Sequence, residues 1–183
     1  MACLAADTKR TGDSGAAAAA PATGTDRLRL LTRTAMIAGL YAALTVLLAP
    51  ISYGPLQVRV AEALTVLPFV SPAAVPGLFL GCVVANLWGG LGWQDVVFGS
   101  LATLLAALTT RWLGQTHRPA FLAPLPPVVF NALIVPAYLH VLFALPYWLT
   151  AGQVLLGQVV ACYALGYPLL LLLLRGGLAQ RWR

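Results

Sequence analysis

The sequence predicts an all-α membrane protein with about six transmembrane helices, and three observations support this prediction. Hydrophobic residues make up 60% of the 183 residues and charged residues only 9%, whereas a soluble domain has about 25% charged residues. Apolar stretches recur along the chain without the strict alternation of apolar and polar residues that is typical of a membrane β-barrel. The lysines and arginines lie almost entirely outside these stretches, which indicates a defined topology.

The chain begins with a low-complexity segment, residues 1–26, where we expect a disordered cytoplasmic tail. This segment has no apolar core of the kind that a signal peptide needs. Residues 27–183 are expected to form a single transmembrane domain. Cys3, Cys82 and Cys162 are odd in number and divided between the tail and the predicted spans, which favours small packing residues over a disulfide or a metal site.

The first expected span runs from about Thr34 to Ala49 and carries small residues at helical spacing. Small residues four positions apart let another helix approach closely, which is the usual basis of helix packing in membranes. That other helix can belong to this chain or to a separate protein, and the pattern does not choose between them. The two pairs are Ala38 with Ala42 and Gly39 with Ala43.

The second expected span, about Val58 to Phe69, contains Arg59 and Glu62, which are the only charged residues between Met36 and Trp93. A charge at the centre of a membrane helix costs roughly 2.5–3.5 kcal/mol, so such residues usually face a partner, a cavity or a substrate. The spacing of three places both side chains on one helix face. They form either a structural ion pair or, as we favour, part of a polar binding site near a membrane surface.

Four further spans are expected after the first two. The second and third spans of the chain are shorter than the roughly 20 residues that cross a bilayer, which indicates tilted or re-entrant segments. Either form returns the chain to the side that it left. The four are about Gly77 to Trp88, Val96 to Trp112, Phe121 to Phe143, and Gly152 to Leu174.

With six spans, every lysine and arginine except Arg59 falls on one side of the membrane. Positive residues concentrate on the cytoplasmic side, so both termini are predicted to be cytoplasmic in a multi-pass cell-membrane protein. The same placement explains the net charge of +6 without a nucleic-acid partner. The loop before Arg59 and the glycine-rich loop from Trp88 to Asp95 are then on the outer side.

The outer half gathers polar and aromatic side chains that suit a planar, nitrogen-rich and even cationic small molecule. Carboxylates accept pairs of N–H groups, amides both donate and accept, and aromatic rings stack on flat rings. Each residue alone also has a structural explanation: a helix cap for the aspartate, interhelical hydrogen bonds for the asparagines, and interfacial anchoring for the tryptophans. The candidates are Arg59, Glu62, Asn86, Trp88, Trp93, Asp95 and Asn131, with Tyr53, Tyr138, Tyr147 and Trp148 nearby in the predicted topology.

Catalytic and nucleotide-binding motifs are absent from the sequence. It has no H-E-x-x-H, no G-x-S-x-G on a strand-to-helix turn and no phosphate-binding G-x-x-x-x-G-K-[ST] loop. We therefore expect no enzyme, cofactor or metal, and any uptake driven by ATP needs a partner that hydrolyses it.

Four segments together resemble the QueT family, whose members are substrate-binding (S) components of energy-coupling-factor (ECF) transporters assigned to queuosine precursors. The resemblance covers about Thr34 to Leu174. The segments are Gln57 to Phe69, Ser71 to Gly81, Asn86 to Gly92, and Asp95 to Ala107.

The resemblance implies an S-component-like bundle of six helices that captures its ligand on the outer side. It also implies that the chain docks on a transmembrane scaffold protein and that two cytoplasmic ATPases power the transport. The small residues Ala38, Gly39, Ala42 and Ala43 would contact that scaffold, and the loop from Pro50 to Gln57 would serve as a lid.

The ligands that the resemblance implies are 7-deazaguanine bases. Glu62, held by Arg59, would take the ring N–H and exocyclic amine, and Asp95 would take an aminomethyl group, although the two assignments are interchangeable. Asn86 and Asn131 would read other edges, and Trp88 or Trp93 would stack on the ring. The alternatives are an S component for another vitamin-like ligand, a membrane-embedded enzyme, or an assembly protein.

Overall fold

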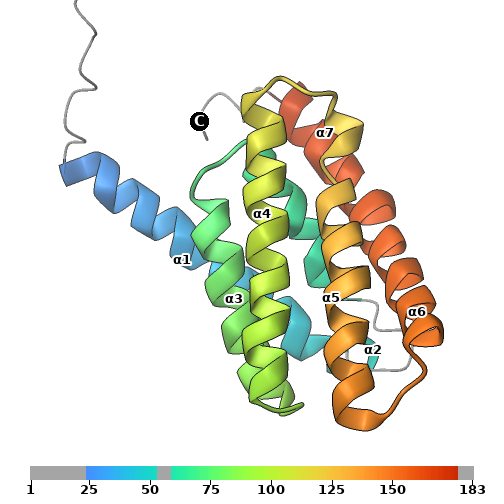
Figure 1. Cartoon of the computed structure of the whole chain (residues 1–183). Helices are drawn as coiled ribbons and strands as arrows, with labels where there is room; N and C mark the ends of the chain where they lie inside the picture. Colours follow the sequence, from blue (N-terminus) through green and yellow to red (C-terminus); the bar gives the residue numbers. More distant parts are fainter. Residues whose placement is uncertain (1–23, 53–58, 177–183) are drawn as a thin grey trace, which may run out of the picture.

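The structure is a computed structural model that describes residues 24–52 and 59–176, and these residues form a helical bundle without strands (Figure 1). The predicted all-α architecture is therefore confirmed. In chain order the elements are α1 (Gly24–Leu47), α2 (Ala49–Ser52), the 3₁₀ helix η1 (Val60–Phe69), α3 (Ala74–Gly89), the π-helical η2 (Asp95–Gly99), α4 (Ser100–Gln115), the 3₁₀ turn η3 (Ala120–Leu122), α5 (Leu125–Phe143), α6 (Tyr147–Val159), the π-helical η4 (Val160–Gly166) and α7 (Tyr167–Arg175).

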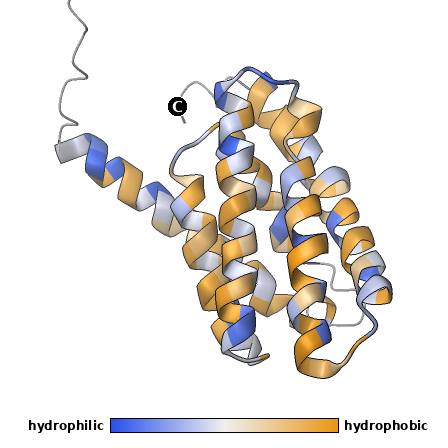
Figure 2. Ribbon diagram, viewed as in Figure 1, coloured by the Kyte–Doolittle hydropathy of each residue, from blue (hydrophilic) through white to orange (hydrophobic). Residues whose placement is uncertain are grey.

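Apolar helices occur at all six places where the sequence predicts spans. By length and composition, four of the described helical runs are able to cross a membrane, and two are shorter. The short ones are η1 and α3, in agreement with the prediction of short second and third spans. Hydrophobic residues, in orange, make up most of the ribbon of the bundle (Figure 2). The four long runs are Gly24–Leu47, Asp95–Gln115, Ala120–Phe143 and Tyr147–Arg175.

Helix α1 begins at Gly24, within the segment expected to be a tail, and its first half projects away from the bundle (Figure 1). Only the second half is packed. Its buried residues recur every three or four positions, as expected of a helix with one face against a neighbour, and they are Thr34, Ile37, Tyr41 and Thr45. This face lies against α3.

The 3₁₀ helix η1 is the central element, because every residue from Ala61 to Phe69 is buried. It contacts α1, α3, α4, η4 and α7. A 3₁₀ helix rises about 2.0 Å per residue, so this ten-residue element spans about 20 Å, which is less than the roughly 30 Å thickness of the apolar layer of a bilayer. The segment that carries Arg59 and Glu62 is thus enclosed by the other helices.

The two ends of the bundle differ in charge. The start of α1, the turn between α4 and η3, and the end of α7 share the upper end in Figure 1. The starts of η2 and α6 lie at the opposite end, with α2. The arginines of the described helices and turns, apart from Arg59, lie in or next to the start of α1, the turn between α4 and η3, and the end of α7. The arginines of the described residues, apart from Arg59, thus gather at one end of the bundle, and a cytoplasmic position of that end stays a prediction.

Candidate functional site

Glu62 is buried to 1% exposure and is held by side chains from two other helices. The Tyr41 hydroxyl on α1 donates a hydrogen bond to Glu62 Oε1 over 2.6 Å. The Asn131 Nδ2 on α5 donates to Glu62 Oε2 over 3.4 Å. Both carboxylate oxygens therefore already have a donor. Tyr41, Glu62 and Asn131, which tie α1, η1 and α5 together, are called the Glu62 cluster below.

The backbone of Glu62 is held as firmly as its side chain. Its carbonyl oxygen accepts a hydrogen bond of 2.5 Å from Thr65 Oγ1. Cys162 Sγ on η4 lies 3.6 Å from the same oxygen and 3.4 Å from Gln158 Oε1, so its S–H can donate to either. A π-helical turn is often found at functional sites, and here η4 provides the contact that fixes η1.

Asp95 opens η2 and is fully buried. Its Oδ1 accepts a hydrogen bond from the Tyr138 hydroxyl on α5 and lies 3.8 Å from the Arg59 guanidinium at the start of η1. The Asn86 Nδ2 on α3 donates to the backbone carbonyl of Asp95 over 3.0 Å. Arg59, Asn86, Asp95 and Tyr138, which join η1, α3, η2 and α5, are called the Asp95 cluster below.

The pairing of the charged residues differs from the sequence expectation. Arg59 was expected to hold Glu62, but its ion pair is with Asp95, and Tyr41 and Asn131 hold Glu62. Arg59 precedes η1 with an extended backbone, and its carbonyl oxygen accepts a hydrogen bond of 2.9 Å from the Glu62 N–H, so the two residues still adjoin. The two clusters are therefore neighbours along η1, with one cation beside two carboxylates.

Gly99 makes room for the Asp95 cluster. A Cβ at this position would lie 2.8 Å from Asn86 Nδ2 and 3.3 Å from Asp95 Oδ1, with the Tyr138 hydroxyl 3.7 Å away. A side chain would push these polar groups apart. The glycine thus allows Asn86, Asp95 and Tyr138 to converge around one point.

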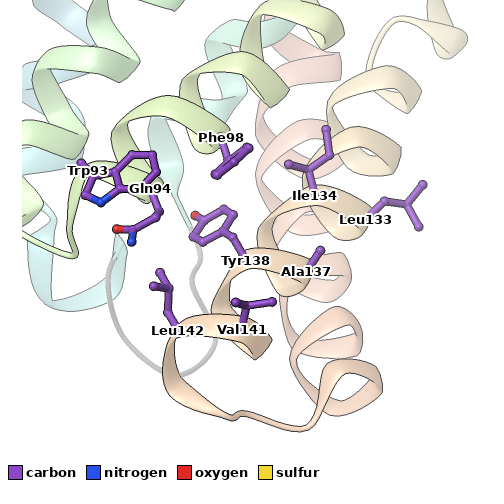
Figure 3. Close-up of a pocket in the computed structure, with 9 residues that line it drawn as sticks. All are labelled: Trp93, Gln94, Phe98, Leu133, Ile134, Ala137, Tyr138, Val141 and Leu142. Carbon is purple, nitrogen blue, oxygen red and sulfur yellow. The ribbon is translucent and has the colours of Figure 1, made fainter.

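The two tryptophans lie at the surface of the bundle. Trp88 is 72% exposed and Trp93 65% exposed. Trp93 lines an apolar groove of about 570 Å³ between η2 and α5, and the ring of Tyr138 forms part of its wall (Figure 3). Because the Tyr138 hydroxyl bonds to Asp95, this side chain separates the groove from the polar interior. Tyr53 and most of the expected lid fall outside the described residues.

Comparison with known proteins identifies the family. The model of the family described as QueT transporter matches residues 31–175. This chain belongs to the QueT transporter family. It is also 30% identical over 144 residues to the queuosine precursor transporter QueT of Lactococcus lactis subsp. cremoris (strain MG1363), covering 70% of this chain and 83% of the relative. No solved structure matches the chain. The predicted membership is confirmed, and membrane transport is the activity class that it gives.

The small residues of α1 divide between two roles in this QueT family member. Ala38 packs inside the chain, because a Cβ on Gly81 of α3 would lie 2.8 Å from the Ala38 carbonyl oxygen. Ala42 is half-buried. Gly39 and Ala43 are exposed, and no atom lies within 4 Å of the position that a Gly39 Cβ would take. Only part of the small-residue pattern is therefore open to another protein.

The sequence analysis missed Tyr41, and it did not place Tyr138 among the site residues. Tyr41 is fully buried and donates the shorter of the two hydrogen bonds to the Glu62 carboxylate. A signal was present, because a tyrosine hydroxyl in the middle of an apolar span needs a buried partner. Gln158 and Cys162, both buried on the last helical run, had no comparable signal. Cys162 contacts the backbone carbonyl of Glu62, and Gln158 Oε1 contacts the Cys162 thiol.

Proposed function

We propose that this chain is the substrate-binding subunit of an ATP-driven ECF-type importer that captures a 7-deazaguanine base on the outer side of the cell membrane. Both termini are then cytoplasmic. Membership of the QueT transporter family and the name of the Lactococcus relative support a queuosine precursor as cargo. The observation that carries the proposal is the pair of buried carboxylates, Glu62 and Asp95, each of which is held by side chains from other helices.

The ligand chemistry follows from the donors of a deazaguanine. Its ring N–H and exocyclic amine suit a carboxylate, and a basic substituent on the other edge suits a second one. Glu62 and Asp95 supply the two, and Arg59, Asn86 and Asn131 orient them or read the remaining edges. Trp88 and Trp93, at the rim, would stack on the base only after moving inward. Selectivity would come from buried polar groups, because an analogue that lacks one partner leaves a group unpaired.

The energy source lies in partner proteins under this proposal. The chain has no nucleotide-binding loop, so two ATPase subunits and a transmembrane scaffold would provide the power stroke. The exposed side of α1 at Gly39 and Ala43 supports docking of a scaffold helix, because small residues permit close approach. Ala42 would lie at the edge of that contact, and Ala38 would support it from within the bundle.

Calorimetric titration of the purified full chain tests the proposal. We expect tight binding of the aminomethyl, cyano or fully elaborated deazaguanine base, and no binding of guanine or riboflavin. Binding of riboflavin or another vitamin instead would keep the architecture and overturn the ligand. Co-purification with a scaffold and ATPases tests the assembly, and substrate turnover by the chain alone would contradict it.

A further inference from the structure

Two buried acceptor atoms of the Asp95 cluster have no hydrogen-bond partner among the residues that the structure describes. They are Asp95 Oδ2 and Asn86 Oδ1, in residues that are 0% exposed. An unsatisfied buried polar atom costs about 1–3 kcal/mol, and more when it carries charge. Native proteins keep few of them, and each one requires an explanation. In the Glu62 cluster, by contrast, both carboxylate oxygens have a donor.

The two unpartnered atoms belong to side chains that are held together. Asn86 Nδ2 donates to the Asp95 backbone, and both side chains pack closely around Gly99, whose Cβ position is 2.8 Å from Asn86 Nδ2 and 3.3 Å from Asp95 Oδ1. The other atoms of these side chains are already engaged: Asp95 Oδ1 with Tyr138 and Arg59, and Asn86 Nδ2 with the Asp95 carbonyl. What remains in each side chain is one acceptor, so a bound group has to bring donors.

The charges of the two clusters also leave one negative charge without a counterpart. Glu62 and Asp95 are carboxylates, and Arg59 is the cation that the two clusters contain. An excess charge in a buried site is unfavourable, because burial strips it of water. A ligand with a single positive charge would neutralise the site, whereas a neutral ligand would leave the imbalance.

We propose that Asp95 Oδ2 and Asn86 Oδ1 form a subsite for a protonated primary amine of the ligand. An ammonium group brings three donors and one positive charge, which match two open acceptors and one uncompensated carboxylate. The inference rests on the proposed transport of a deazaguanine and removes the ambiguity in its orientation. The aminomethyl edge faces Asp95, and the ring N–H edge faces Glu62.

The first test uses the unaltered protein and two ligands of equal size. Calorimetry compares 7-aminomethyl-7-deazaguanine with its 7-hydroxymethyl counterpart, in which a neutral hydroxyl replaces the ammonium group. The amine is expected to bind about 10- to 100-fold more tightly, as for hydrogen bonds between charged groups. Equal affinities would overturn the amine subsite and leave the proposed function intact. Failure of both ligands to bind would overturn both proposals.

The second test assigns the preference to a residue. Asp95→Asn preserves side-chain size and removes the charge, so it is expected to reduce the ratio of the two affinities to near one. Asp26→Asn is the matched control, because Asp26 is an exposed carboxylate paired with Arg29 at the far end of α1. Glu62→Gln is expected to weaken both ligands by similar factors. A ratio that persists in Asp95→Asn but falls in Glu62→Gln would overturn the assignment.

Discussion

The bundle is held together in two different ways. Helices pack backbone against backbone at glycines, whereas the Glu62 and Asp95 clusters join helices through polar side chains. Where α1 crosses α3, a Cβ on Gly77 or Gly81 would lie within 3.0 Å of atoms of α1, so backbone meets backbone with no space left. Gly166 of η4 meets η1 in the same manner, with the Ala63 carbonyl 2.9 Å from its Cβ position. The clusters instead join helices through single hydrogen bonds between buried polar side chains.

This difference separates the scaffold from the site. Close packing without side chains fixes the distance between two helices and tolerates little change. Hydrogen bonds between side chains fix direction, and they leave acceptor atoms that a ligand can use, as at Asp95 and Asn86. The glycine contacts are therefore expected to determine stability, and the clusters to determine binding.

The largest loss of stability is expected at Gly114, near the end of α4. A Cβ there would overlap the carbonyl oxygen of Phe69 at the end of η1, which is backbone and unable to move aside. Gly114→Ala is expected to destabilise the chain by about 3 kcal/mol or more. Thermal unfolding in detergent measures this. Gly152→Ala on α6 is the control, since no atom lies within 4 Å of its Cβ position. A small effect at Gly114 would contradict the rigid contact.

An intermediate effect is expected at Tyr41. Tyr41→Phe keeps the ring and removes the donor to Glu62 Oε1, so a buried carboxylate oxygen loses its hydrogen bond. We expect a loss of about 1.5–3 kcal/mol in the free energy of unfolding, together with weaker ligand binding. Tyr163→Phe is the control, because Tyr163 is half-buried on η4 and outside both clusters. Equal unfolding curves for the two variants would show that the Tyr41 bond contributes little.

The sequence was sufficient to predict the helical class, the places of the six apolar segments and the gathering of the arginines at one end of the bundle. Those features depend on composition, on segment length and on the distribution of arginines, all of which are local properties. The shortness of the segment around Arg59 and Glu62 was also visible. Its 3₁₀ form and its central position were not, because both depend on the helices that surround it.

The sequence did not predict which residues pair inside the site, because this pairing also depends on how the helices pack together. Arg59 and Glu62 are three residues apart, so a local argument pairs them. The bundle instead brings Asp95 to Arg59 and Tyr41 and Asn131 to Glu62, across sequence separations that no periodicity reveals. The π-helical turns η2 and η4, which direct Asp95 and Cys162 inward, have no simple sequence signature either.

The smallest effect on stability, and the largest on assembly, is expected at Gly39. Its Cβ position is open, so Gly39→Leu should change the midpoint of thermal unfolding little, in contrast to a substitution at a packed glycine. The larger side chain would hold a scaffold helix away, because close approach requires small residues. Co-purification of scaffold and ATPases with Gly39→Leu, compared with Gly152→Leu, measures this effect. Because Gly39 lies outside both clusters, ligand binding by the isolated chain should persist. A variant that binds ligand yet recruits no partner would show that ligand binding and docking to the scaffold use different surfaces. Normal recruitment by Gly39→Leu would place the docking surface elsewhere on the bundle.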